Sequence, residues 1–187
     1  DLKQRNVSRD ASIHHQPGEA KRLAIFLFSS RPLLEDTVNG CIDGLRENGY
    51  EEGHNLLIQR FNAENDLPTA HNIAKNIVGG RFDMVATAST ICMQVMAAAN
   101  RDGVINHVFA AVTDPFGSGV GISRENPLDH PRWLAGVGTF QPVKETFRYA
   151  KRIHPDLTVI GTAWNPSEAC SEACTRFARE VSDELGI

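Results

Sequence analysis

The sequence of 187 residues lacks the features that define several classes of protein. No apolar run approaches the ~20 residues of a membrane span, and four cysteines are too few for a disulfide scaffold. With 15 glycines and 9 prolines the chain is neither collagen-like nor of low complexity. The formal charge of −4 argues against nucleic acid as a partner, because a phosphate-binding surface needs a basic patch. An apolar fraction of 41% instead indicates a globular protein with a sizeable core.

Motifs of catalysis and metal binding are also missing. The sequence has no phosphate loop, no H-E-x-x-H or C-x-x-C metal spacing and no G-x-S-x-G nucleophile elbow. The glycines of segment 117–121 follow a predicted strand, but residues 122–131 cannot open the helix that a dinucleotide site requires. We therefore expect no enzymatic activity, no cofactor and no metal, and we interpret 117–121 as a loop.

The cysteines Cys170 and Cys174 form the only close pair. A redox or metal pair is one interpretation, but adjacent helical turns present side chains poorly for a bridge. We favour a buried helical stripe that Phe177, Val181 and Leu185 continue. We also expect the other two cysteines to occupy helix-core positions, namely Cys41 and Cys92.

Residues 1–21 form a polar tail without an apolar leader region. They fit a linker that follows a leader or a membrane anchor. His14 and His15 fit solvated positions better than a metal site, and the sequence Asn6-Val-Ser8 matches a glycosylation sequon only formally.

From residue 22 onward apolar runs alternate with segments of helical periodicity. The runs predict strands, and the periodic segments, most of them ended by glycine, predict helices. The predicted strands are Leu23–Phe28, Leu56–Phe61, Met84–Ala88, His107–Val112 and Leu157–Ala163. The predicted helices are Leu33–Asn48, Pro68–Val78, Ile91–Asn100, Val143–Ile153 and Ser167–Leu185.

This alternation predicts a mostly parallel α/β sheet with helices on both faces, in which ligands bind beyond the carboxyl ends of the strands. Four short polar loops follow these ends: Ser29–Pro32, Ser89–Thr90, Thr113–Phe116 and Trp164–Glu168. At the last loop, Asn165 is expected to cap the final helix and Pro166 to be its first residue. Ile187 then begins another strand with nothing after it, so we interpret the chain as truncated within a second lobe.

Two kinds of side chain at these loops allow alternatives. Asp114 stands alone, without a base, nucleophile or metal partner, so it is either a ligand hydrogen-bonder or a loop cap. A tryptophan can stack on a ligand or fill a core or hinge. The two interpretations weigh equally for Trp164, and the core is favoured for Trp133.

Several segments resemble a known family. Phe28-Ser-Ser-Arg31-Pro32, Phe109-Ala-Ala-Val-Thr-Asp114-Pro115 and Asn165-Pro-Ser-Glu168-Ala169 are similar, in this order, to the substrate-binding proteins of ABC importers whose members include binders of tryptophan and other aromatic amino acids. The resemblance covers residues 22–187 and implies a periplasmic-binding-protein type I fold. A first α/β lobe would span 22–139, and 140–187 would hold the hinge crossing and the start of a second lobe.

The resemblance also implies which residues bind the ligand. They are Ser29, Ser30, Arg31, Ser89, Thr90, Thr113 and Asp114 in the first lobe, and Asn165, Ser167 and Glu168 in the second, with Trp164 beside them. The family commonly has an acidic residue and a histidine where this chain has Ser30 and Arg31. The guanidinium of Arg31 favours a ligand with more negative charge. The change of the family's Gly-Asn-Val-Thr-Gly segment to Arg132-Trp133-Leu-Ala-Gly136 also argues against an aromatic amino acid.

The function implied is a periplasmic or extracellular solute-binding protein, with an ABC permease as partner and an amino acid or other small carboxylate as ligand. A membrane anchor would precede the chain. The first alternative is the ligand-sensing domain of a signalling protein, and the second is a flavodoxin-like α/β enzyme. The fold alone does not separate the solute-binding protein from the sensing domain.

Overall fold

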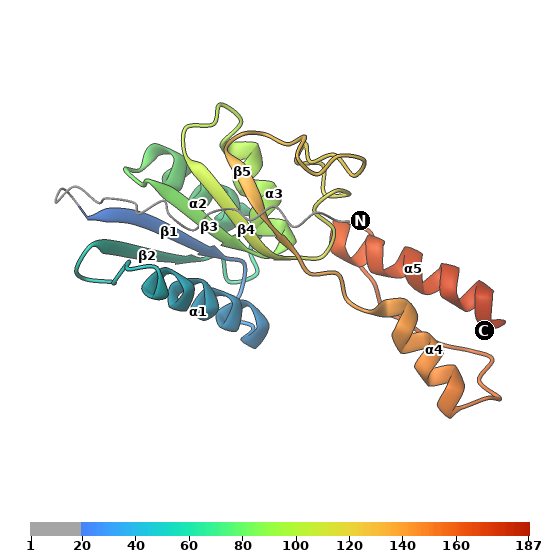
Figure 1. Ribbon diagram of the computed structural model, residues 1–187. Coiled ribbons are helices and arrows are strands. Elements are labelled where there is room, and N and C mark those ends of the chain that lie inside the picture. Colours follow the sequence, from blue (N-terminus) through green and yellow to red (C-terminus); the bar gives the residue numbers. More distant parts are fainter. Residues whose placement is uncertain (1–19) are drawn as a thin grey trace, which may run out of the picture.

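A five-stranded sheet is the centre of the fold (Figure 1). The computed structural model describes residues 20–187, so His14, His15 and the Asn6 sequon lie outside the described residues. All neighbouring strands are parallel, in the order β2-β1-β3-β4-β5. The strands are β1 (Lys21–Leu27), β2 (Leu56–Asn62), β3 (Met84–Ala88), β4 (Asn106–Val112) and β5 (Leu134–Gly138). We call residues 21–138 the sheet unit.

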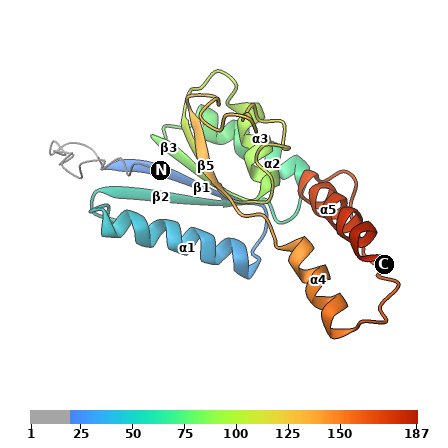
Figure 2. The same ribbon diagram turned by 45° about the vertical axis from the view of Figure 1, so that its right-hand side comes forward.

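Three helices cover the two faces of this sheet, and two lie outside it. Helix α1 (Pro32–Glu47) lies on one face, and α2 (Leu67–Gly79) and α3 (Thr90–Ala99) lie on the other (Figure 2). Helices α4 (Val143–Ile153) and α5 (Ala169–Leu185) pack together beyond the carboxyl ends of the strands (Figures 1 and 2). The predicted class, a parallel α/β sheet flanked by helices, is confirmed.

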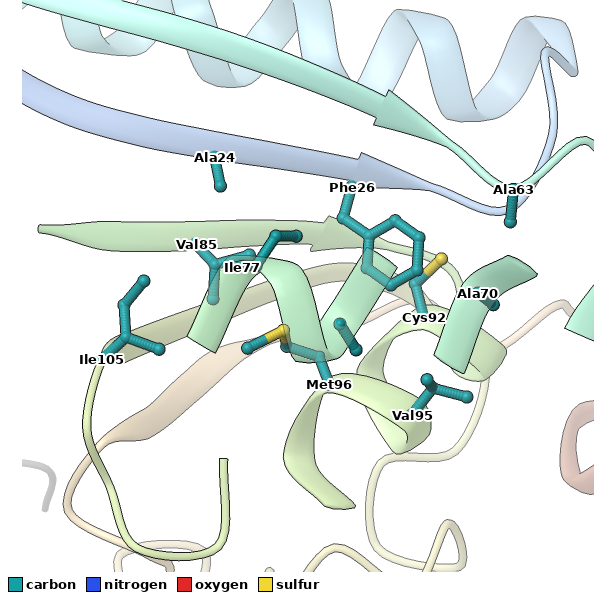
Figure 3. Packing of buried hydrophobic residues seen from close by; sticks show 11 residues of the cluster. Ala24, Phe26, Ala63, Ala70, Ile77, Val85, Cys92, Val95, Met96 and Ile105 are labelled. Atoms are coloured by element: carbon teal, nitrogen blue, oxygen red, sulfur yellow. The ribbon is translucent and has the colours of Figure 1, made fainter. Parts of the chain in front are cut away.

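The hydrophobic pattern explains how the layers assemble. Leu23–Leu27 of β1 are all buried, because this central strand is covered on both sides, and Phe26 pairs with Phe61 of β2 and Thr87 of β3. Alternate residues of β1 therefore belong to different cores. Ala24 and Phe26 pack with Ile77 of α2 and Met96 of α3 (Figure 3). Leu23, Ile25 and Leu27 pack with α1.

Local chemistry sets where the helices begin. The Asp66 carboxylate accepts a hydrogen bond from Thr69 N at 2.8 Å and caps α2, next to Pro68 in the first turn. The Ser89 hydroxyl caps α3 by accepting from Cys92 N at 3.2 Å. The predicted cap of the last helix is wrong, because α5 begins after Glu168, and Asn165 and Pro166 precede it.

The fifth strand is not where the sequence predicts it. Residues 157–163 form no strand, and the fifth strand is Leu134–Gly138, which pairs with β4 at the edge of the sheet. A strand needs a hydrogen-bonded neighbour, and no described segment pairs with 157–163. Ile187 forms no strand either, since its N–H bonds to the carbonyl of Ser182 after the left-handed Gly186.

The cysteines are free thiols. Cys92 is buried in the core as predicted, whereas Cys41 lies on an exposed part of α1, so that prediction is wrong. Cys170 and Cys174 are half-buried on α5, and Val181 of the predicted stripe is fully buried. Burial raises the pKa of both α5 thiols, and the charge of Glu168 raises that of Cys170 further.

Candidate ligand-binding site

The first predicted loop lies between β1 and α1. Ser29 is buried, whereas Ser30 and Arg31 are exposed. The Ser30 hydroxyl accepts a hydrogen bond at 2.8 Å from the side-chain amide of Asn62, which is the last residue of β2. Arg31 is the N-terminal cap residue of α1, and its guanidinium has no hydrogen-bond or ion-pair partner among residues 20–187. Its positive charge is therefore available to a ligand.

The second loop lies between β3 and α3 and contains a strained residue. Ser89 has φ of 119°, which a side-chain-bearing residue rarely adopts and which costs on the order of 1–3 kcal/mol. This conformation lets its hydroxyl cap α3 and places Thr90 in the first turn. The Thr90 hydroxyl accepts a hydrogen bond from Thr113 N, the first residue after β4, at 3.4 Å. The loops that follow β3 and β4 are thus joined directly.

The third loop contains Asp114, whose side chain is only 7% exposed. Its two oxygens lie 2.9 and 2.7 Å from the same nitrogen, Nη2 of Arg124, and Gly117 N donates to one of them at 3.1 Å. The Ser118 hydroxyl donates to its backbone carbonyl at 2.5 Å. The carboxylate is therefore a loop cap and an ion-pair partner.

The position of these loops in the sheet makes them a candidate site. Strand β1 lies between β2 and β3 in the sheet. The chain passes from β1 to β2 on one side and then crosses to β3 on the other side, so the order of the strands reverses between β1 and β3. In open α/β sheets, ligands bind in the crevice at such a switch point, outside the carboxyl ends of the strands. The loops at Ser29–Arg31 and Ser89–Thr90 lie on the two sides of this point, and Thr113 lies next to them.

The last predicted loop precedes α5. Asn165 donates from its amide to the Glu168 carboxylate at 2.9 Å and accepts from Ser167 N at 3.0 Å. Glu168 lies 3.8 Å from the Cys170 thiol, and the Thr90 side chain lies close enough to this thiol to offset part of the rise in its pKa. This chain of contacts brings the start of α5 to the carboxyl edge of the sheet.

Trp164 lies elsewhere. The guanidinium of Arg179, on α5, lies 5.3 Å from the centre of the indole ring. The tryptophan lines a hollow of about 280 Å³ with Phe147 and Ile160, away from the three loops of the sheet unit. Trp133 is half-buried and stacks on His107, as expected of a core aromatic.

Four side chains at this edge were not predicted as site residues: Asn62, Arg124, Cys170 and Arg176. Asn62 directly follows the predicted strand Leu56–Phe61, so its position at the carboxyl end of a strand was a usable signal. Arg124 lies in an irregular loop ten residues after Asp114, where no periodicity predicts which side chains meet. Cys170 and Arg176 reach the edge only because α5 crosses it, which no local pattern indicates.

Two further features of the described residues bear on other functions. Between residues 20 and 187, no helix is long and apolar enough to cross a membrane. In the same part of the chain, no three histidine, cysteine, aspartate or glutamate side chains are grouped to hold a metal ion.

Comparison with known proteins then identifies the family. The family model described as "ABC transporter substrate binding protein" matches residues 22–187. The chain belongs to this family. A conserved domain protein from Vibrio cholerae has a TM-score of 0.83 and 30% identity, over 90% of this chain and 55% of that one.

Two further relatives have names that state a ligand. A Streptococcus pneumoniae ABC domain, solved in complex with L-Trp, matches with a TM-score of 0.82 and 25% identity, over 90% of this chain and 55% of its own. A tyrosine-binding protein of Clostridioides difficile is 31% identical over 152 residues, 81% of this chain and 43% of that protein. The chain thus spans about half the length of the relatives it matches. One of these two relatives is named as a binding protein, and the other was solved with an amino acid bound.

Proposed function

We propose that this chain is part of an extracytoplasmic receptor that captures a small organic ligand and delivers it to an ABC permease. The sheet unit, with the first lobe extending from 22 to 139, would form one wall of the cleft. Residues 140–187 would form the hinge crossing and the start of the second wall. The observation that carries the proposal is the convergence of polar loops at the switch point of the sheet, in a chain of the substrate-binding family.

The proposed binding residues are those of the three loops and of the segment before α5. In the first wall they are Ser29, Ser30, Arg31, Ser89, Thr90 and Thr113. In the second they are Asn165, Ser167 and Glu168. Asp114 is bonded within its own loop and Trp164 lies against α5, so we leave both out of the proposed set, and their ligand roles stay predictions.

The ligand we propose is an amino acid or another small carboxylate. Relatives named for tyrosine and tryptophan support the amino-acid class. The free guanidinium of Arg31 supports a bond to an anionic group, because arginine binds a carboxylate through two parallel hydrogen bonds. Ligand binding would draw the two walls together, as in other two-lobed receptors.

We place the receptor in the periplasm or outside the cell, where the substrate-binding proteins of ABC importers work. The polar residues 1–21 would serve as the linker to a membrane anchor. Fractionation of cells that produce the natural full-length protein tests this, and recovery from the cytosol would contradict it.

A thermal-shift screen tests the binding function directly. The natural full-length protein is screened against amino acids, small carboxylates, nucleosides and sugars. A ligand present at a hundred times its dissociation constant adds about 2.7 kcal/mol to the free energy of unfolding. We expect a shift with at least one amino acid or carboxylate. No shift with any compound would contradict a receptor for small solutes.

A further inference from the structure

The Asp114 carboxylate is occupied by groups of the protein itself. Arg124 holds both of its oxygens, and Gly117 N donates to one of them. Arg176, which projects from α5, lies 3.9 Å from the other oxygen. An ammonium group of a ligand would therefore have to displace an arginine from a carboxylate that is almost fully buried.

The arginines, in contrast, remain open to a ligand. The side chain of Arg124 is 60% exposed and that of Arg176 is 52% exposed. Two guanidinium groups and one carboxylate leave an excess of one positive charge here. Within residues 20–187, Glu168 forms no ion pair with either arginine, and its carboxylate accepts a hydrogen bond from Asn165. A charge-assisted bond to an anion is the interaction that this arrangement offers.

An apolar hollow adjoins the two arginines. It has a volume of about 600 Å³, and its lining includes Arg124, Phe116, Phe140 and Phe177. The Arg124 guanidinium lies 5.1 Å from the ring centre of Phe116, and that of Arg176 lies 5.4 Å from the ring centre of Phe177. Phe140 and Phe177 meet edge to face. Aromatic walls beside a cation suit a ligand with an apolar body and an anionic group.

We propose that Arg124 determines the charge class of the ligand, and that Asp114 is the positioning residue that holds it. The ligand is an aromatic or apolar carboxylate that needs no amino group for recognition. Its carboxylate bonds to Arg124, and its body lies against Phe116 and the neighbouring phenylalanines. This inference rests on the proposed receptor function and adds the chemistry of the ligand to it.

Matched pairs of ligands test this specificity. Calorimetry on the natural full-length protein compares phenylalanine, tyrosine and tryptophan with phenylpropanoate, hydroxyphenylpropanoate and indolepropanoate, which lack the amino group. We expect one of the acids without the amino group to bind about tenfold or more tightly than its amino acid, since an ammonium group gains no partner here.

Three variants test which residues cause the preference for acids that lack the amino group. Arg124→Gln should reduce the preference at least about tenfold, because the anion loses its charged donor. Asp114→Asn should keep the preference, because the asparagine oxygen still accepts from Arg124 and Gly117. Arg101→Gln, at an exposed arginine outside the predicted site, should change neither affinity.

Two sets of results would overturn the inference. Tighter binding of the amino acid of each pair, or a selective loss of amino-acid binding in Asp114→Asn, would show that Asp114 takes the ammonium group. Binding of none of the six compounds, while the screen finds another ligand, would also overturn it and leave the receptor function intact. If no compound of the whole screen binds, the proposed function itself has failed.

Discussion

The amide of Thr113 donates a hydrogen bond to the hydroxyl of Thr90 at 3.4 Å, and this bond joins the loops that follow β3 and β4. Thr90 also contacts the thiol of Cys170 on α5. One hydroxyl therefore connects two strands of the sheet unit to the helix that lies beyond their carboxyl ends.

Replacement of Thr90 by valine should remove this connection. The buried N–H of Thr113 would lose its acceptor, at a cost of about 1 kcal/mol, and ligand affinity should fall because the loops of the site separate. Urea denaturation and calorimetry measure the two effects. Thr90→Ser keeps the hydroxyl and serves as the control. Equal behaviour of the valine and serine variants would show that the hydroxyl is unimportant.

Replacement of Arg31 by alanine should separate binding from stability. Because this guanidinium has no partner among residues 20–187, the free energy of unfolding should change by no more than about 0.5 kcal/mol. Affinity for an anionic ligand should fall about tenfold or more. Arg101→Ala, also at an exposed arginine, is the control for a general change of charge. A variant that binds the ligand as well as the parent would refute the role of Arg31.

The free energy of unfolding should decrease as the pH is lowered, because of His107. This side chain is buried and hydrogen-bonded to Thr87 at 2.8 Å, and burial lowers its pKa to about 4. In the unfolded chain the histidine pKa is about 6.5, so between about pH 6.5 and pH 4 the unfolded chain binds a proton at this residue and the folded chain does not. The stabilising effect of the neutral ring is thus complete above about pH 6.5 and is lost as the pH falls toward 4.

The size of this effect can be measured by urea denaturation at pH 7.5 and pH 5. The single histidine should account for a decrease of about 2 kcal/mol between these values. His107→Gln keeps a donor for Thr87 and should lose that part of the pH dependence. The exposed His54→Gln should keep it. The same pH dependence in both variants would contradict the assignment to His107.

Two glycines should respond in opposite ways to alanine. A β-carbon at Gly136, on β5, would lie 2.6 Å from the Cγ atom of Phe109, so Gly136→Ala should destabilise the protein by about 1–3 kcal/mol. A β-carbon at Gly40, inside α1, meets no atom within 4 Å. Gly40→Ala should therefore stabilise by about 0.5–1 kcal/mol through helix propensity. Denaturation midpoints that moved in the same direction would refute this packing of β5 on β4.

Gly136 also helps to explain why the sequence does not predict β5. Leu134 is the only buried residue of this strand, and two of its five residues are glycine, so its sequence shows neither alternation nor an apolar run. Gly136 is needed because Phe109 lies against the backbone there. In contrast, Leu23–Leu27 is buried throughout and was predicted correctly. The segment 157–163 has strand-like composition, but composition alone cannot supply a neighbouring strand.

The candidate site also has a part that the sequence predicts and a part that it does not. Loops at the carboxyl ends of β1, β3 and β4 were predictable, because the order of strands and helices implies where such loops gather. The partner of Asp114 was not predictable, because Arg124 reaches it from an irregular loop whose path depends on tertiary packing. Sequence reasoning left Asp114 as a ligand group or a loop cap, and the bonds from Gly117 and Arg124 support the cap.

The central claim is that a small organic ligand binds at the carboxyl edge of this parallel sheet. A crystal structure of the natural full-length protein, in complex with the compound that gives the largest thermal shift, tests it most directly. We predict a ligand within about 4 Å of Thr90 and of an arginine at that edge, Arg31 or Arg124. A ligand bound away from the loops that follow β1, β3 and β4 would contradict the account.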